Sequence, residues 1–272
     1  MEVLTKIKKE TLVTKNSDIV VLILNENKGY TILEKDMIDW VVEAVKNFTC
    51  VCADYKGEDI LPFVNSFKFT HKYIMVLYDK IPMLTDRTVN KLVEYVVFKN
   101  SQACKFAGGY MFKNEYLKSV KNLFFDSVYF QDEEDFYLVE NKRNLSFVSD
   151  VLQQRIINKH INNGVQFVHP KTVVVGPDVE IRKNVVIMKG NALKGKTTIL
   201  DNVILKENNI IENAIIENDV CVSSSTITNS KIGSGSFVLP YCHIEESVIG
   251  KNCTIKSGSS LIKQKIKNNT KS

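Results

Sequence analysis

The stretch VGPDVEIRKNVVIMKGNALKGKTTILDNVIL, Val175 to Leu205, decides the fold because its aliphatic residues recur at every sixth position. The recurring residues are Val175, Ile181, Ile187, Leu193, Ile199 and Leu205. A period of six fits neither the turn of an α-helix nor the alternation of a flat strand. It is typical of a hexapeptide β-solenoid, in which each hexad forms a short strand and a corner, and the aliphatic residue points inward.

The same period continues, with slips of one residue, as far as Leu261. Its later members are Ile211, Ile216, Val222, Ile232, Val238, Ile244, Ile249, Ile255 and Leu261. Small or β-branched residues follow most of these by four positions, as at Thr226 and Val248. If three hexads close one triangular coil, the span predicts about five coils. The helix before Gly164 and the segment after Leu261 are expected to cover the open ends.

The residues before this region alternate between two patterns. The segments DIVVLIL, TCVCADY and YIMVLY predict buried strands, whereas EKDMIDWVVEAVKNF and DRTVNKLVEYVVFKN carry apolar residues at helical spacing. Thr85 or Asp86 is expected to cap the second of these helices. This order predicts an α/β domain with a largely parallel sheet.

Four regions follow from these patterns. We expect the α/β domain over residues 1–143 and a linking helix over 144–164, with Ser146 as its N-cap and Gly164 as its left-handed C-terminal cap. The β-helix is expected over 165–262. Residues 263–272 carry Lys263, Lys265, Lys267 and Lys271 without interleaved aromatic residues, which favours a solvated basic tail over a nucleic-acid contact.

Composition narrows the class of protein. The chain has 272 residues, is 44% hydrophobic and 25% charged, and has a net charge of +5, which is ordinary for a globular protein. No apolar run is long enough for a membrane span, and the start MEVLTKIKKE lacks the apolar core of a signal peptide. The six cysteines have no zinc-site spacing. We therefore expect a cytoplasmic protein with reduced thiols and with no nucleic-acid or membrane partner.

The junction VLQQRIINKHINNGVQFVHPKTVVVGPDVEI resembles the bacterial bifunctional N-acetylglucosamine-1-phosphate uridylyltransferase/glucosamine-1-phosphate acetyltransferase family. The matching residues are Leu152, Arg155, Ile156, Gly164, Val165 and Pro170. A second similarity covers IMVLYDKIPMLTDRTVNKLVEY, which looks like the strand, metal-binding turn and helix of the family's first domain. The resemblance implies a shortened, Rossmann-like α/β nucleotidyltransferase-like domain, a linking helix and a left-handed parallel β-helix of hexapeptide repeats.

The nucleotidyltransferase motifs depart from the family at the positions that bind metal and phosphate. When Pro82 is set against the family's proline, Lys80 stands where the family has its magnesium-binding aspartate, and Asp79 stands where it has glycine. A lysine cannot ligate magnesium, although its ammonium can bind a phosphate or lie solvated in a turn. Ala107 stands at the family's second metal ligand. Of the glycine-rich phosphate loop, Lys28 and Gly29 remain, while Asn27 and the pair Tyr30-Thr31 depart from it.

The acetyltransferase half departs as well. In LPYCHIEESVIG, Glu245 replaces an arginine that helps the family hold its sugar phosphate, and His243 is expected to point outward at a corner. The sequence given stops about two coils later, before the family's catalytic histidine segment. We therefore assign no catalytic residue and no metal ligand; the candidate nucleotide- or phosphate-binding residues are Lys28, Gly29, Asp79 and Lys80.

Three readings of function stay open. The first, which the residues favour, is a degenerate sugar-nucleotide-binding, regulatory or scaffold protein that is not an enzyme and needs no cofactor. The second is an active sugar-phosphate nucleotidyltransferase that holds Mg²⁺ with rearranged ligands, such as Asp79 and the acids of Asp132 to Asp135. The third is a hexapeptide acyltransferase that uses His243. In each case we expect a homotrimer, because outward apolar residues such as Val174, Val186 and Ile204 would otherwise face water.

Overall fold

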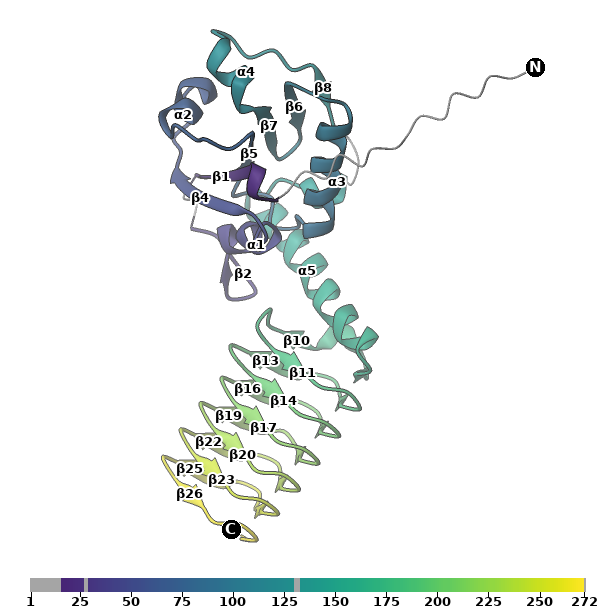
Figure 1. Ribbon diagram of the computed structural model, residues 1–272. Helices are drawn as coiled ribbons and strands as arrows, with labels where there is room; N and C mark the ends of the chain where they lie inside the picture. The colour runs from purple at the N-terminus through teal and green to yellow at the C-terminus, as the bar shows by residue number, and fades with distance from the viewer. Residues whose placement is uncertain (1–15, 27–28, 130–132, 272) are drawn as a thin grey trace, which may run out of the picture. The chain divides into compact units, whose positions relative to one another are not determined.

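The computed structural model describes residues 16–26, 29–129 and 133–271. The chain divides into two compact units, one up to Val148 and one from Ser149 onward, and each is described by itself (Figure 1). Within the described ranges, no helix is both long and apolar enough to cross a bilayer.

The first unit is built on a six-stranded sheet in the order β4-β1-β5-β7-β6-β8. Its strands are β1 (Ile19–Asn25), β4 (Thr49–Asp54), β5 (Tyr73–Tyr78), β6 (Ala103–Phe106), β7 (Gly109–Lys113) and β8 (Ser127–Val128). β1 pairs in parallel with β4 and β5, and only β7 runs against its neighbours. A small hairpin of β2 (Thr31–Ile32) and β3 (Lys35–Asp36) follows β1. The predicted α/β domain with a largely parallel sheet is confirmed.

Helices cover both faces of this sheet because β1 is apolar on both sides. Ile19, Val21 and Ile23 pack in the core shared with α1 (Met37–Ala44) and α3 (Asp86–Phe98). The alternate residues Val20, Leu22 and Leu24 pack in a second core with α2 (Ile60–Ser66) and α4 (Asn114–Ser119). Two short 3₁₀ turns, η1 (Asn16–Asp18) and η2 (Glu133–Phe136), complete the unit.

The cap of α3 is Thr85, one of the two residues predicted for this role. Its hydroxyl oxygen accepts the backbone N–H of Thr88 at 3.2 Å. Such a side chain satisfies one of the backbone donors that the first turn of a helix leaves without a partner.

The linking helix α5 (Lys142–Asn162) begins earlier than predicted. Asn141 caps it, since its Oδ1 accepts the backbone N–H groups of Arg143 and Asn144, each at 3.0 Å. Ser146, the predicted cap, already lies within the helix and donates its hydroxyl to Lys142 O at 3.3 Å. The end is as predicted: Gly164 has φ +88°, and its N–H donates to Ile161 O at 3.0 Å.

The C-terminal part of α5 covers the first coil of the solenoid. Ile157 is buried in the solenoid core, and Ile156 packs against it. The Gln153 side-chain amide pairs with Val175 in both directions, donating to its carbonyl and accepting from its N–H, each at 3.3 Å. This amide therefore takes the place of a missing strand neighbour at the edge of the first coil.

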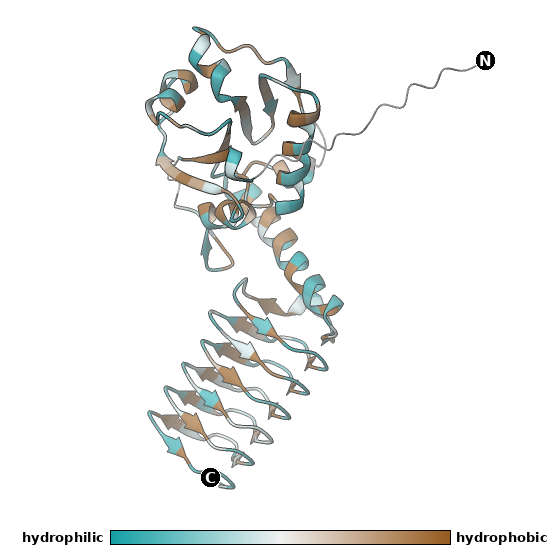
Figure 2. Cartoon of the chain, in the orientation of Figure 1, coloured by the Kyte–Doolittle hydropathy of each residue, from teal (hydrophilic) through white to brown (hydrophobic). Residues whose placement is uncertain are grey.

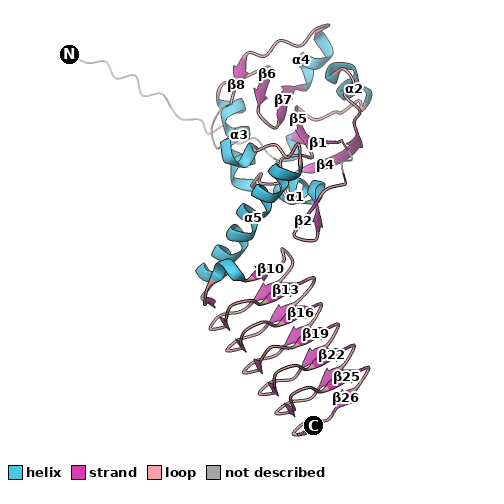
Figure 3. Cartoon of the chain, turned by 180° about the vertical axis from the view of Figure 1, so that it is seen from behind, coloured by secondary structure: helices cyan, strands magenta, loops and turns pink. Residues whose placement is uncertain are grey.

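Three six-stranded parallel sheets form the walls of the solenoid, which appear as rows of magenta strands in Figure 3. The first wall contains β10 (Val174–Val175), β13 (Ala192–Lys194), β16 (Ile210–Glu212), β19 (Thr226–Thr228), β22 (His243–Glu245) and β25 (Ser260–Ile262). The second contains β11 (Glu180–Ile181), β14 (Thr198–Ile199), β17 (Ile215–Ile216), β20 (Lys231–Ile232), β23 (Val248–Ile249) and β26 (Lys265–Ile266). The third contains β9 (Gln166–Phe167), β12 (Val186–Ile187), β15 (Ile204–Leu205), β18 (Cys221–Val222), β21 (Phe237–Val238) and β24 (Thr254–Ile255). A 3₁₀ turn, η3 (Pro170–Thr172), precedes β10.

The hexapeptide β-helix is thus confirmed, and hydrophobic residues recur on the strands of every coil (Figure 2). It is longer than predicted, since each wall has six strands where about five coils were expected. The segment 263–272, expected to be a solvated tail, contains β26, and Lys271 makes a further bridge to Thr254. This segment therefore continues the stack instead of capping it.

The predicted inward residues from Val175 to Ile255 are confirmed as buried, but the sequence analysis missed one inward residue, Ile227. Ile227 points inward and is fully buried, while Thr226 and Val248 point outward and Ser225 and Ser247 occupy the inner corners. The reason is that the corner after the first wall shortens from residues 195–197 to residues 213–214 in the next coil, and the corner before β19 also loses one residue. Each shortening moves the inward position by one residue.

Corners between walls require a left-handed backbone, which asparagine and glycine adopt at low cost. One column of corners consists of Asn184, Asn202, Asp219, Gly235, Asn252 and Asn269, all with positive φ. Its side chains also link neighbouring coils, as where Asn202 Nδ2 donates to Asp219 Oδ1 at 3.1 Å. A Cβ at Gly235 would lie 2.5 Å from Asn252 Oδ1, so a side chain at this corner would have to displace the Asn252 amide.

The adjacent residues Ile215 and Ile216 give a test of the inward register. Ile216 is fully buried and Ile215 is 44% exposed, so Ile216→Asp and Ile215→Asp place the same carboxylate inside and outside the wall. An unpartnered buried carboxylate costs several kcal/mol, comparable to the stability of a domain. We expect Ile216→Asp to unfold residues 165–266 in hydrogen-exchange experiments and Ile215→Asp to cost about 1 kcal/mol or less. Equal protection in the two variants would show that the register is wrong.

A second test uses Glu217, at the corner after β17. Its carboxylate lies 2.7 Å from Lys231 Nζ and accepts the N–H and hydroxyl of Ser234 at 3.0 and 2.9 Å. The Lys231 ammonium and the Ser234 donors lower the pKa of Glu217 from 4.5 to about 2. Because the folded-state pKa is lowered, the carboxylate stabilises the fold above pH ~4.5 and loses this contribution as the pH falls towards 2.

We therefore expect Glu217→Gln to lower the free energy of unfolding by about 1–2 kcal/mol at pH 7 and by much less at pH 3. Urea unfolding at the two pH values measures the difference. Glu180→Gln, at an exposed outward position of the same wall, is the control and should show no such pH dependence. If Glu217→Gln lowered the free energy of unfolding by the same amount at pH 7 and at pH 3, the lowered pKa of Glu217 would be contradicted.

Candidate functional site

The candidate site lies where β1 and β5 end. These strands are parallel neighbours, with Leu24 opposite Tyr78, so the residues that follow them meet at the carboxyl edge of the sheet. Glu26 follows β1, and Asp79 and Lys80 follow β5. The fold therefore brings together acidic and basic groups that lie more than 50 residues apart in the chain. In open α/β sheets this edge is where ligands bind.

Asp79 is only 4% exposed and organises the backbone at this edge. Its N–H donates to Leu24 O at 3.0 Å, which continues the pairing of β5 with β1. Its side-chain Oδ2 accepts the N–H of Glu26 at 3.1 Å. Asp79 thus holds the start of the loop after β1.

Lys80 is ion-paired within the chain. Its Nζ lies 2.8 Å from Glu26 Oε1, and the two side chains are only 17% and 22% exposed. The ammonium also lies 4.8 Å from the centre of the Tyr78 ring, and the Lys80 carbonyl accepts the N–H of Val139 at 2.8 Å. The alternative of a solvated turn residue is therefore wrong. Glu26 was missed in the sequence analysis, although its place directly after β1 could have revealed it.

The residues at this edge do not fit a magnesium ion. Among the described residues, no group of three or more His, Cys, Asp or Glu side chains could hold a metal. Lys80 offers an ammonium, which cannot ligate a cation, and Ala107 lies exposed in the turn between β6 and β7 with no donor atom in its side chain.

Rearranged metal ligands find no support in the acids of Asp132 to Asp135 either. Asp135 accepts the hydroxyl groups of Thr85 and Thr88 at 2.8 and 2.5 Å, so it fixes the start of α3. Asp132 lies outside the described residues.

A small cavity of about 150 Å³ borders Asp79. It is lined by Asn25, Gly29, Tyr30, Asp36, Met37, Ile38 and Asp79. Gly29 has φ +62°, while Lys28, the other candidate from this loop, lies outside the described residues. Pockets for ligands of nucleotide size usually have volumes of ~300–1,000 Å³. This cavity has room for one small polar group.

A row of tyrosines fills the space beside Lys80. The Tyr78 ring packs edge-on against Tyr55 and Tyr110, with ring centres 6.2 and 6.3 Å apart. Burial, followed by its contact with the Tyr110 hydroxyl, raises the pKa of Tyr78. The phenol therefore stays neutral at physiological pH. The sequence analysis did not identify this row, because its three members come from segments far apart in the chain.

His243 points outward from the first wall of the solenoid, as expected, between the buried residues Cys242 and Ile244. It lies on the strand β22 and not at a corner. Its Nε2 is 3.3 Å from Glu245 Oε2, and the two side chains are 46% and 39% exposed. A histidine beside a carboxylate is the arrangement that a general base uses, although here it is open to solvent.

The fold defines a class, the hexapeptide-repeat β-helix proteins. In agreement, the model of the family described as bacterial transferase hexapeptide (six repeats) matches residues 229–263.

The curated relatives of this chain point to a narrower family than the hexapeptide-repeat class. The chain is 38% identical over 139 residues to the bifunctional protein GlmU of Clostridium acetobutylicum, a match that covers 51% of this chain and 30% of that protein. It is 36% identical over 134 residues to GlmU of Clostridium beijerinckii, covering 49% and 30% of the two chains. It is 33% identical over 126 residues to GlmU of Alkaliphilus metalliredigens, covering 46% and 28%. The resemblance to the bifunctional family is confirmed, and the matched part spans less than a third of these relatives' length.

Among solved structures, the chain is similar to a variant of perosamine N-acetyltransferase from Caulobacter crescentus in complex with CoA and GDP-perosamine. The identity is 15%, the TM-score is 0.36, and the match covers 92% of this chain and 90% of that one. At this level of similarity the neighbour carries no argument about function.

Proposed function

We propose that this chain is a non-catalytic relative of the bifunctional uridylyltransferase/acetyltransferase family. Its proposed role is that of a regulatory or scaffold protein in cell-wall sugar-nucleotide metabolism, with a sugar nucleotide as its candidate ligand. The observation that carries the proposal is the ion pair of Lys80 with Glu26 at the position of the family's metal ligand.

The physical argument concerns charge at the triphosphate. Uridylyl transfer needs a divalent ion that neutralises the phosphates while the nucleophile attacks in line. An ammonium at the metal position repels such an ion. Lys80 could meet a phosphate itself only by leaving Glu26, and separating a largely buried ion pair leaves a carboxylate without its partner at a cost of several kcal/mol. The carboxyl edge of the sheet therefore favours a structural role for Lys80 and Glu26 over catalysis of uridylyl transfer.

A second candidate, acyl transfer, is favoured by one observation, the His243–Glu245 pair on the exposed wall of the solenoid.

One panel of assays on the full chain tests both candidates. We expect no Mg²⁺-dependent release of pyrophosphate from UTP with N-acetylglucosamine-1-phosphate, and no release of CoA from acetyl-CoA with glucosamine-1-phosphate. The double change Asp79→Gly, Lys80→Asp should not restore the first reaction, because Ala107 still offers no second ligand.

The outcomes of this panel separate the candidates. Pyrophosphate release by the natural chain that stops when a chelator is added would refute the proposal and support an active nucleotidyltransferase. CoA release that is lost in His243→Ala, but kept in the control His169→Ala, would establish acyl transfer.

We also propose that the solenoid forms a homotrimer through its third wall. The outward residues of β12, β15, β18 and β21 are Val186, Ile204, Cys221 and Phe237, an uncharged column in which Ile204 and Phe237 are 40% and 52% exposed. The second wall carries Glu180, Thr198, Ile215 and Lys231 at the equivalent positions, so two of its four positions are charged. An apolar column of this length is typical of an interface, and three-sided prisms pack well around a threefold axis.

Light scattering at micromolar concentration tests the assembly. We expect a mass three times that of the 30.9 kDa chain. Phe237→Glu should reduce it to the mass of one chain, whereas Val248→Glu, on the second wall at 45% exposure, should leave it unchanged. A natural chain with the mass of a monomer, or a trimer that Val248→Glu disrupts instead, would contradict this interface.

A further inference from the structure

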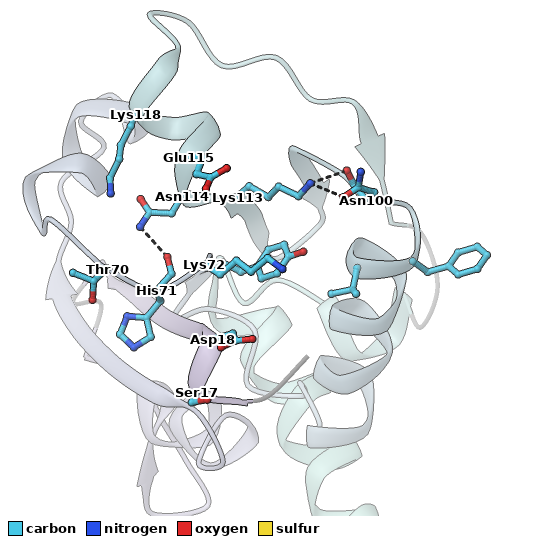
Figure 4. A pocket seen from close by; sticks show the side chains of 13 residues that line it. Ser17, Asp18, Thr70, His71, Lys72, Asn100, Lys113, Asn114, Glu115 and Lys118 are labelled. Atoms are coloured by element: carbon cyan, nitrogen blue, oxygen red, sulfur yellow. Dashed lines mark hydrogen bonds between the residues drawn. The ribbon is translucent and has the colours of Figure 1, made fainter. Parts of the chain in front are cut away.

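A larger cavity lies at the opposite edge of the first unit's sheet, where β1 and β5 begin and β7 ends (Figure 4). Its volume is about 1070 Å³. The residues before β5, the end of α3 and the start of α4 form its walls. This amino-edge cavity is separated from Asp79 and Lys80 by the length of β5, so it is distinct from the candidate site described above.

Three lysines line the amino-edge cavity, and Figure 4 shows them distributed around the hollow: Lys72 before β5, Lys113 at the end of β7, and Lys118 on α4. Only two acids, Asp18 and Glu115, line it as well. Lys113 Nζ is held by Asn100, through its Oδ1 at 2.6 Å and its carbonyl at 3.3 Å.

Within the part of the chain that the structure describes, Lys72 and Lys118 make no ion pair, although the Lys72 ammonium lies 5.5 Å from the centre of the Tyr73 ring. The cavity therefore presents positive charge that carboxylates of the described residues do not neutralise.

The wall that carries Lys72 is fixed by a buried side chain. Asn114 is 6% exposed, and its Nδ2 donates to Phe69 O at 2.7 Å. It also donates to His71 O at 2.8 Å, the bond that Figure 4 draws. These two bonds hold the segment 69–72 against the start of α4. A site whose backbone is already ordered loses less entropy when a ligand binds.

An exposed aromatic ring completes the lining. Phe98, at the end of α3, is 85% exposed and borders the cavity. An exposed phenyl ring at the border of a cavity lined by lysines suits a ligand that combines a planar base with phosphates, since the base can stack while the lysines bind the phosphate oxygens.

We propose that the amino-edge cavity binds a nucleoside triphosphate without a metal ion. Its volume is sufficient for a ligand of this size. Lys72 and Lys118 supply ammonium donors to the phosphate chain, Lys113 adds fixed charge, and Phe98 stacks on the base. This site is independent of the proposed function, which concerns the opposite edge of the same sheet.

Calorimetric titration of the full chain with ATP in the presence of a chelator tests the proposal. We expect the double variant Lys72→Gln, Lys118→Gln to weaken ATP binding about tenfold or more. The control Lys189→Gln, Lys251→Gln removes the same charge from exposed positions of the solenoid and should bind like the natural chain. Phe98→Ala should weaken ATP but leave inorganic tripolyphosphate unchanged. Lys80→Ala should have no effect on either ligand.

Several results would overturn the assignment. One is no heat of binding with ATP, and another is equal weakening by the cavity variant and the solenoid control. A loss of ATP binding in Lys80→Ala would place the nucleotide at the carboxyl edge. Tripolyphosphate that binds as tightly as ATP, with no effect of Phe98→Ala, would exclude recognition of the base.

Discussion

The second unit depends on the stacking of one aliphatic side chain above another along each wall of the solenoid. Its strands have only two or three residues, so no strand can bury a hydrophobic face without the coils on either side. The column Ile181, Ile199, Ile216, Ile232, Ile249 and Ile266 shows the result, because each member contacts its equivalents one coil away. This dependence explains why α5 must end the stack, and why the Gln153 amide pairs with the open backbone of Val175.

In the first unit, the corresponding constraint is electrostatic. Lys80 and Glu26 neutralise each other at the carboxyl edge of the sheet, and the Lys80 ammonium lies 4.8 Å from the centre of the Tyr78 ring. An ion pair with little exposure is hard to exchange for a ligand, because each charge must keep a partner. Lys80 and Glu26 therefore hold the ends of β5 and β1 together at this edge of the sheet.

The two edges of the sheet consequently differ in character. The carboxyl edge has a small cavity, an internal ion pair between Lys80 and Glu26, and packed tyrosine rings. The amino edge has a large cavity with lysines that no ion pair among the described residues neutralises. In open parallel sheets the carboxyl edge ordinarily takes the ligand. In this domain the distribution of charge and space is reversed.

The sequence by itself determined the architecture, because the burial of Val175, Ile181, Ile187 and their successors requires a period that only a hexapeptide coil satisfies. It also determined the left-handed cap at Gly164 and the N-cap at Thr85, since each depends on residues close in the chain. Only the tertiary structure decided the register around Ile227, where corners lose a residue without a local signal. It alone also paired Lys80 with Glu26 and gathered Lys72, Lys113 and Lys118 around one cavity. These groups come from distant segments, and their meeting depends on strand order and direction, which no local pattern specifies.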